Sequence, residues 1–217
     1  MTAPRLDLFA GIHKGLRALM AHVLVRVGRL DPHDLDDVAE VTEDVRALLT
    51  LCASHVHHEN RVIHPALEAR HPGSSAQTAV DHVRHEDAIA ALGALVERVG
   101  GDDEAARELY RDLAAFVAHN LEHMEFEETH HNGLLWEAYS DVELMALHQN
   151  ILSQLTPQEM QLGMRWILPH VNPAQRAGML GGLRQAAPPQ VFEHMLALVR
   201  PQLGGRDWRK LSTALAL

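Results

Sequence analysis

Cysteine is nearly absent from the sequence, with Cys52 alone among 217 residues. A single cysteine excludes an intramolecular disulfide framework and any zinc site built on paired CxxC motifs. Basic residues are also scarce, because 19 lysines and arginines face 29 aspartates and glutamates, for a net charge of −10 with neutral histidines. Clustered basic side chains are what neutralise phosphate backbones, so this balance argues against a nucleic-acid partner.

Long hydrophobic runs are missing too. No run approaches the roughly 18 apolar residues that a membrane helix needs. The N-terminal segment lacks the charged, apolar and small-residue regions of a secretory signal. We therefore expect a cytoplasmic protein without a membrane partner. Its length and its hydrophobic fraction of 47% allow one large or two small domains with a real core.

Sustained strand-like alternation is absent, whereas apolar residues recur at spacings of three and four, which is typical of helices. Turn or breaker residues interrupt this pattern at 31–34, 71–73, 100–102 and 132–133. The pattern predicts an all-α fold in which residues 1–140 form an up-down-up-down four-helix bundle. The first helix is expected over about residues 5–29, and the fourth is expected to end near Asn132-Gly133.

Composition changes after residue 140, and residues 141–217 are predicted to form a helical extension of three or four shorter helices. Two segments within it have the pattern of a helix start: an N-cap residue, then a proline at the first helical position, then a glutamate or glutamine two positions after the proline. These segments are Thr156-Pro157-Gln158-Glu159 and Asn172-Pro173-Ala174-Gln175. No site chemistry is evident there. Its apolar side chains are candidates for a homodimer or partner interface, namely Met164, Trp166, Phe192 and Met195.

Histidine is abundant, with 17 residues, and 14 of them lie in residues 1–140. Imidazole is the commonest neutral metal ligand in proteins. Histidine or glutamate interrupts the inward apolar row of each bundle helix at similar depth: His13, then His55 and Glu59, then His82 and His85, then His123 and Glu127. A buried charged glutamate is costly unless it is paired or binds a metal, so these positions need a common explanation.

The spacing of these residues is duplicated. His13 precedes His55 by 42 residues and His82 precedes His123 by 41, and each second histidine is followed four positions later by a glutamate. Side chains four residues apart share a helix face, so an HxxxE segment delivers a nitrogen and an oxygen to one point. The chain therefore reads as two copies of a helix pair whose ligating residues meet at the centre of the bundle.

With the His13-Lys-Gly-Leu16 start and both HxxxE segments, the chain resembles the hemerythrin-like (HHE cation-binding) domains over about residues 8–136. The resemblance implies a four-helix bundle that holds a non-haem di-iron centre through histidines and two carboxylates. Members of the family bind O₂ reversibly or act in oxygen, iron, NO or redox responses. Carried over residue by residue, the metal ligands would be His13, His55, Glu59, His82, His85, His123 and Glu127.

The third helix departs from the family pattern, because its pair is His82-x-x-His85 while Glu86 stands four residues after His82. Glu86 is thus a rival to His85, and His119, four residues before His123, is an alternate ligand. The donor types suit iron, zinc, copper or nickel, and only the resemblance points to iron.

We expect a non-haem di-iron binding protein that binds or senses O₂ or a related small diatomic ligand. The alternative is a di-iron enzyme on the same scaffold, with oxidase, peroxidase or NO-consuming activity. Cys52 is expected to be a small buried hydrophobe. The remaining bundle histidines outside the inward rows are expected to be solvated or to cap helices, notably His22, His33, His57, His64, His71, His130 and His131.

Overall fold

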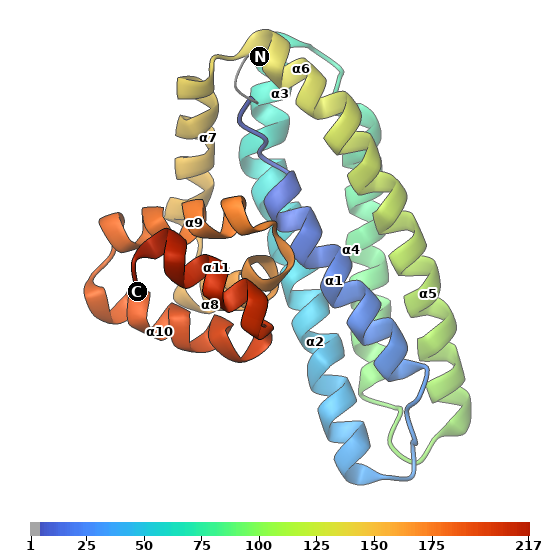
Figure 1. Ribbon diagram of the computed structural model, residues 1–217. Helices are drawn as coiled ribbons and strands as arrows, with labels where there is room; N and C mark the ends of the chain where they lie inside the picture. The colour runs from blue at the N-terminus through green and yellow to red at the C-terminus, as the bar shows by residue number, and fades with distance from the viewer. Residues whose placement is uncertain (1–4) are drawn as a thin grey trace.

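The computed structural model describes residues 5–217, and all regular structure in that range is helical, which confirms the all-α fold (Figure 1). Long helices that run side by side build the bundle, and a group of shorter helices covers one side of it. In chain order the bundle comprises α1 (Ala10–Val27), α2 (Leu35–His58), the π-helix η1 (Glu59–Ile63), α3 (His64–Arg70), α4 (Ala76–Val96), α5 (Asp103–Phe126), the π-helix η2 (Glu127–His131) and α6 (Asn132–Ala138).

Aspartate caps set the starts of the second helix in each pair. The side chains of Asp34 and Asp102 accept hydrogen bonds from the backbone N–H groups of the first turns of α2 and α5, which satisfies donors that have no partner within the helix. The two loops at this end are tied together because Gly101, at a φ of 73°, donates its N–H to the carbonyl of Pro32 at 2.6 Å. A residue with a side chain would be strained at that φ.

Two predicted helix ends are wrong. The first helix begins at Ala10 rather than near residue 5, because the carboxylate of Asp7 accepts hydrogen bonds from the N–H groups of Phe9 and Ala10 and caps it there. The fourth helix does not stop at Asn132-Gly133 but continues through α6 to Ala138. A single glycine lowers helix propensity by about 1 kcal/mol, which the packing of α6 overrides.

Two apolar clusters fill the bundle and leave a polar layer between them. The larger cluster includes Leu16, Met20 and Leu48 and extends toward the capped loops. The smaller cluster, at the end formed by α3 and α6, contains Phe9, Ile63, Leu67, Leu135 and Leu144. His13 lies on α1 between Phe9 of one cluster and Leu16 of the other, so the polar layer is enclosed by hydrocarbon at both ends.

The extension consists of five α-helices and a short 3₁₀-helix rather than the predicted three or four helices. The predicted starts at Thr156 and Asn172 are confirmed as capping boxes, and Ser140 forms a third with Glu143. The predicted boundary at residue 140 thus coincides with a helix cap. The elements are α7 (Asp141–Gln154), α8 (Pro157–His170), α9 (Pro173–Ala186), α10 (Pro189–Val199), η3 (Arg200–Gln202) and α11 (Gly205–Leu215).

Helix α8 joins the extension to the bundle, where it packs against α1 and α2. At its N-terminus, Glu159 accepts a hydrogen bond of 2.7 Å from Ser54 of α2. Near its C-terminus, a Cβ on Gly15 of α1 would lie 2.9 Å from Cγ1 of Ile167 and 3.1 Å from its backbone nitrogen. Contacts that short do not occur, so glycine is what allows the two backbones to approach.

The apolar residues proposed for a partner interface are used within the chain. Phe192 and Met195 are buried in the extension's own core, Met164 packs against that core, and Trp166 packs against the core of the bundle. These four side chains therefore pack within the chain, and a partner interface formed by the extension stays a prediction. In residues 5–217, no helix combines the length and apolar character that crossing a membrane requires.

The close approach at Gly15 leads to a stability prediction. Gly15→Ala should lower the free energy of unfolding by about 1–3 kcal/mol, because the added methyl group overpacks the α1–α8 contact. Gly93→Ala in α4 is the matched control, since a Cβ there meets nothing within 4 Å. It should raise stability by about 0.5–1 kcal/mol through helix propensity. Urea unfolding of the three proteins measures both effects, and equal stability of Gly15→Ala and wild type would contradict the packing argument.

Candidate metal centre

Six side chains from four bundle segments converge in the polar layer. They form two overlapping groups, and within each group one potential ligand atom of every residue lies within 4.8 Å of the others. The first group is His13, His55, Glu59 and Glu127, and the second group is Glu59, His82, His123 and Glu127. Both groups share the two glutamates, so the structure brings six of the seven predicted ligands together at one centre.

All four imidazoles turn Nε2 toward the centre. Nε2 of His13 lies 3.2 Å from Nε2 of His55. The equivalent distance in the second group, between His82 and His123, is 3.0 Å. Two nitrogen lone pairs at this separation repel each other unless a proton or a cation lies between or beside them.

Each glutamate presents one oxygen to each group. Oε1 of Glu59 is 3.4 Å from Nε2 of His55, and Oε2 is 3.4 Å from Nε2 of His82. Oε2 of Glu127 is 3.4 Å from Nε2 of His13, and Oε1 is 3.3 Å from Nε2 of His123. The two halves of the site are therefore related by an approximate twofold axis, as the duplicated spacing predicts.

Burial makes this arrangement costly without a cation. His13 and Glu127 are fully buried, and Glu59 is 3% exposed. None of the four carboxylate oxygens has a hydrogen bond of good geometry. Unpaired buried charge is among the most expensive features of a protein interior, and a bound metal ion is one of the few ways to balance it. The donor set of imidazole and carboxylate fits a first-row transition metal.

The surroundings of the two glutamates shift their pKa values in opposite directions. Burial, and then the charge of Glu127, raise the pKa of Glu59 well above its ordinary value. Burial would also raise the pKa of Glu127, but contacts with His123 and His13 hold it well below the ordinary value. Burial, and then the charge of His123, lower the pKa of His82 to about 3. His82 is therefore neutral at pH 7, which is the state that ligates a metal.

Oxygen atoms outside the centre fix the orientation of two rings. Nδ1 of His13 lies 3.0 Å from Oε1 of Glu128, and Nδ1 of His82 lies 2.6 Å from Oδ1 of Asn60. An oxygen acceptor requires the proton on Nδ1, so in the neutral form of each ring the Nε2 lone pair faces the centre.

Both glutamates stand at the first position of a π-helix, η1 at Glu59 and η2 at Glu127. A π-turn adds a residue to the helical turn and is frequent at functional sites. The sequence interpretation missed both, because apolar spacing alone does not reveal one extra residue per turn. After Glu127 the apolar row gives way to His130 and His131, but after Glu59 it continues with Val62 and Ile63, so no sequence signal marks both π-helices.

His85 is buried but belongs to neither group. Its ring centroid lies 4.8 Å from that of His123 and 6.0 Å from that of Phe116. Its Nδ1 atom has no hydrogen-bond partner. The two rivals from the sequence, Glu86 and His119, are exposed on the bundle surface.

The expectation that His64 and His131 are solvated is wrong. His131 is fully buried and His64 is 7% exposed. The His64 ring stacks on that of His82 at 4.8 Å with an interplanar angle of 5°, and its Nε2 lies 3.2 Å from Oγ1 of Thr78. Nε2 of His131 lies 3.3 Å from the carbonyl of Ser74. Both residues follow a glutamate of the centre, where the π-helices change which face points inward.

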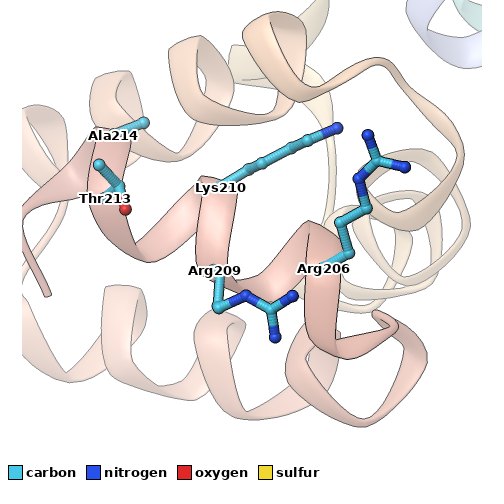
Figure 2. A pocket seen from close by; sticks show the side chains of 5 residues that line it. All are labelled: Arg206, Arg209, Lys210, Thr213 and Ala214. Atoms are coloured by element: carbon cyan, nitrogen blue, oxygen red, sulfur yellow. The ribbon is translucent and has the colours of Figure 1, made fainter.

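A surface hollow on α11 is lined by basic side chains, unlike the His–Glu centre of the bundle. It is lined by Arg206, Arg209 and Lys210 together with Thr213 and Ala214. In Figure 2 the side chains of Arg206 and Lys210 reach toward the same region while Arg209 points away from them. Three cationic side chains without a histidine or acid exclude this hollow as a cation site.

Two facing His–Glu groups at the centre of a helical bundle could hold metal ions, which is the arrangement of the metal-binding helical bundles. The family model described as the hemerythrin HHE cation binding domain matches residues 5–134, and the chain belongs to this family. Comparison with curated proteins and with solved structures gave no match.

The cost of the buried carboxylates is testable in metal-free protein. Glu59→Gln should raise the free energy of unfolding at pH 7 by about 1–3 kcal/mol, because a neutral amide removes an unsatisfied buried carboxyl group. Since the pKa of Glu59 is raised in the folded state, wild type loses stability as pH rises above the ordinary glutamate value. The difference should therefore shrink toward pH 4.5.

Urea unfolding of chelator-treated protein at the two pH values measures this difference. Glu125→Gln, a change at an exposed position on the same helix as His123, serves as the control and should be neutral. A Glu59→Gln protein that is less stable than wild type without metal would show that Glu59 already has adequate partners.

Proposed function

We propose that this protein carries a non-haem di-iron centre that binds or senses O₂ or a related small diatomic ligand. The observation that carries the proposal is the placement of Glu59 and Glu127, each with one oxygen toward either histidine pair. Carboxylates so placed are suited to bridge two ions, one in each group. Family membership supports the binding of a metal cation.

In this proposal His13 and His55 would hold one iron, and His82 and His123 would hold the other. Each group supplies four protein donors, which leaves open positions on an ion that prefers octahedral coordination. His85 stays a predicted additional ligand, and its unpartnered buried Nδ1 beside His123 supports that assignment.

The choice of iron rests on the resemblance to hemerythrin-like domains, since the donor set alone also suits zinc, copper or nickel. Iron in such a site supplies reversible binding of small oxygen- or nitrogen-containing molecules. The chain's own contribution is a dry enclosure, with Phe9 and Leu16 closing it along α1. We also place the protein in the cytoplasm, which the lone buried Cys52 supports.

A di-iron enzyme with oxidase, peroxidase or NO-consuming activity is the second candidate. Buried His64 and His131 favour it, because they add polar imidazoles at one end of the centre where a simple carrier site needs only apolar cover. Iron-loaded protein that turns over hydrogen peroxide or NO in steady state would support the enzyme. A stable, reversible O₂ adduct without turnover would support the binding protein.

The ligand assignment predicts a specific loss of iron. His55→Ala should remove at least one of the two expected irons and weaken the charge-transfer absorption of the oxidised protein. His57→Ala is the matched control, because His57 lies two residues away on the same helix and is exposed. Iron content per chain and the optical spectrum measure both. Equal iron in the two variants, or less than one iron per wild-type chain, would contradict the proposed centre.

A further inference from the structure

The two halves of the centre differ at one repeated position. The residue after each shared glutamate reaches across to the histidine of the neighbouring helix pair: Glu128 contacts Nδ1 of His13 at 3.0 Å, and Asn60 contacts Nδ1 of His82 at 2.6 Å. The two histidines are otherwise matched in burial, since both are at most 1% exposed. The twofold relation is thus broken by a carboxylate in one half and an amide in the other.

Neighbouring charged residues also differ between the His13 and His82 halves of the centre. Arg17 donates to the same Oε1 of Glu128 at 2.6 Å, which holds the carboxylate in position against His13 while offsetting part of its charge. In the other half, the carboxylate of Asp81 is 3.7 Å from Nδ1 of His123, which is longer than a hydrogen bond. Asp81 is also shared with Arg84, at 3.4 Å.

The acceptor on Nδ1 affects how strongly Nε2 donates to a metal. A carboxylate that accepts the N–H of a ligating imidazole forms a charge-assisted hydrogen bond and raises the basicity of the ring. An amide oxygen orients the ring equally well but carries no net charge. Loss of such an outer carboxylate typically costs about 10- to 100-fold in metal affinity.

We propose that the two metal positions are unequal, with the first group (His13, His55, Glu59 and Glu127) filled first and the second group binding a more exchangeable ion. Each group has four donors, because His85 belongs to neither, so the acceptors on Nδ1 are what distinguish the two groups. Glu128 acts as a positioning residue that strengthens the first group, and Asn60 leaves the second group weaker. This inference rests on the proposed two-ion centre. If the second position binds its ion more weakly, its occupancy changes with the free metal concentration while the first position stays filled.

The direct test is a titration of metal-free protein with Co²⁺ alone, with a competing chelator to resolve tight binding and visible absorption as the readout. Wild type should bind two ions in two separated steps. Glu128→Gln should weaken the first step by about 10-fold or more and leave the second unchanged. Asn60→Asp should tighten the second step, and a gain of affinity has no explanation in misfolding.

Two further pairs of variants show which group of ligands is responsible for each binding step. His82→Ala should retain one tightly bound ion, whereas the symmetric His13→Ala should retain only weak binding. Asp81→Asn tests the other nearby carboxylate and should leave the tight step unchanged, as should the exposed Glu125→Gln.

The possible failures are distinguishable. Two equal binding steps, or a tight step that Glu128→Gln does not weaken, would overturn the inequality while leaving the two-ion centre intact. If Asp81→Asn abolished the tight binding step instead, the stronger position would lie in the second group, and the proposed order of filling would be wrong. Binding of fewer than two Co²⁺ ions to wild type would overturn the proposed function itself.

Discussion

The structure depends on two carboxylates that are buried opposite each other in the middle of a hydrocarbon interior. Glu59 and Glu127 are almost without solvent contact and lack hydrogen bonds of good geometry. Apolar clusters close the layer at both ends, so the carboxylates are held away from bulk solvent. Four imidazole nitrogens face the same space. A cation is the simplest partner for all of these atoms together, and the bundle positions the residues that would hold it.

Duplication explains why so specific an arrangement arises from simple elements. Each helix pair supplies one histidine from its first helix and an HxxxE segment from its second. The matched distances among these six residues agree within 0.2 Å, as between the paired nitrogens at 3.2 and 3.0 Å. The π-helices occur at the same place in both halves. Departure from this symmetry at Asn60 and Glu128 is therefore informative, because the common architecture does not require it.

Features that depend on periodicity could be predicted from the sequence. Helical spacing predicted the bundle, and the duplicated HxxxE register predicted the convergence of His13, His55, Glu59, His82, His123 and Glu127. Features that break periodicity were missed. The π-helices turn His64 and His131 inward, and no apolar spacing signals that change. His85 is inward-facing as expected, but its three-residue offset from His82 places it beside His123 and outside both groups. The docking of α8 depends on the small size of Gly15, which is evident only once the two helices are side by side.

X-ray absorption spectroscopy of the iron-loaded protein tests the central claim most directly, because it reports both the donor atoms and the neighbouring metal. The account predicts nitrogen and oxygen donors only, since Cys52 lies outside both groups, together with a second iron at about 3.5 Å, the separation typical of two-metal sites. Iron without a metal neighbour, or iron with a sulfur ligand, would contradict a centre bridged by Glu59 and Glu127.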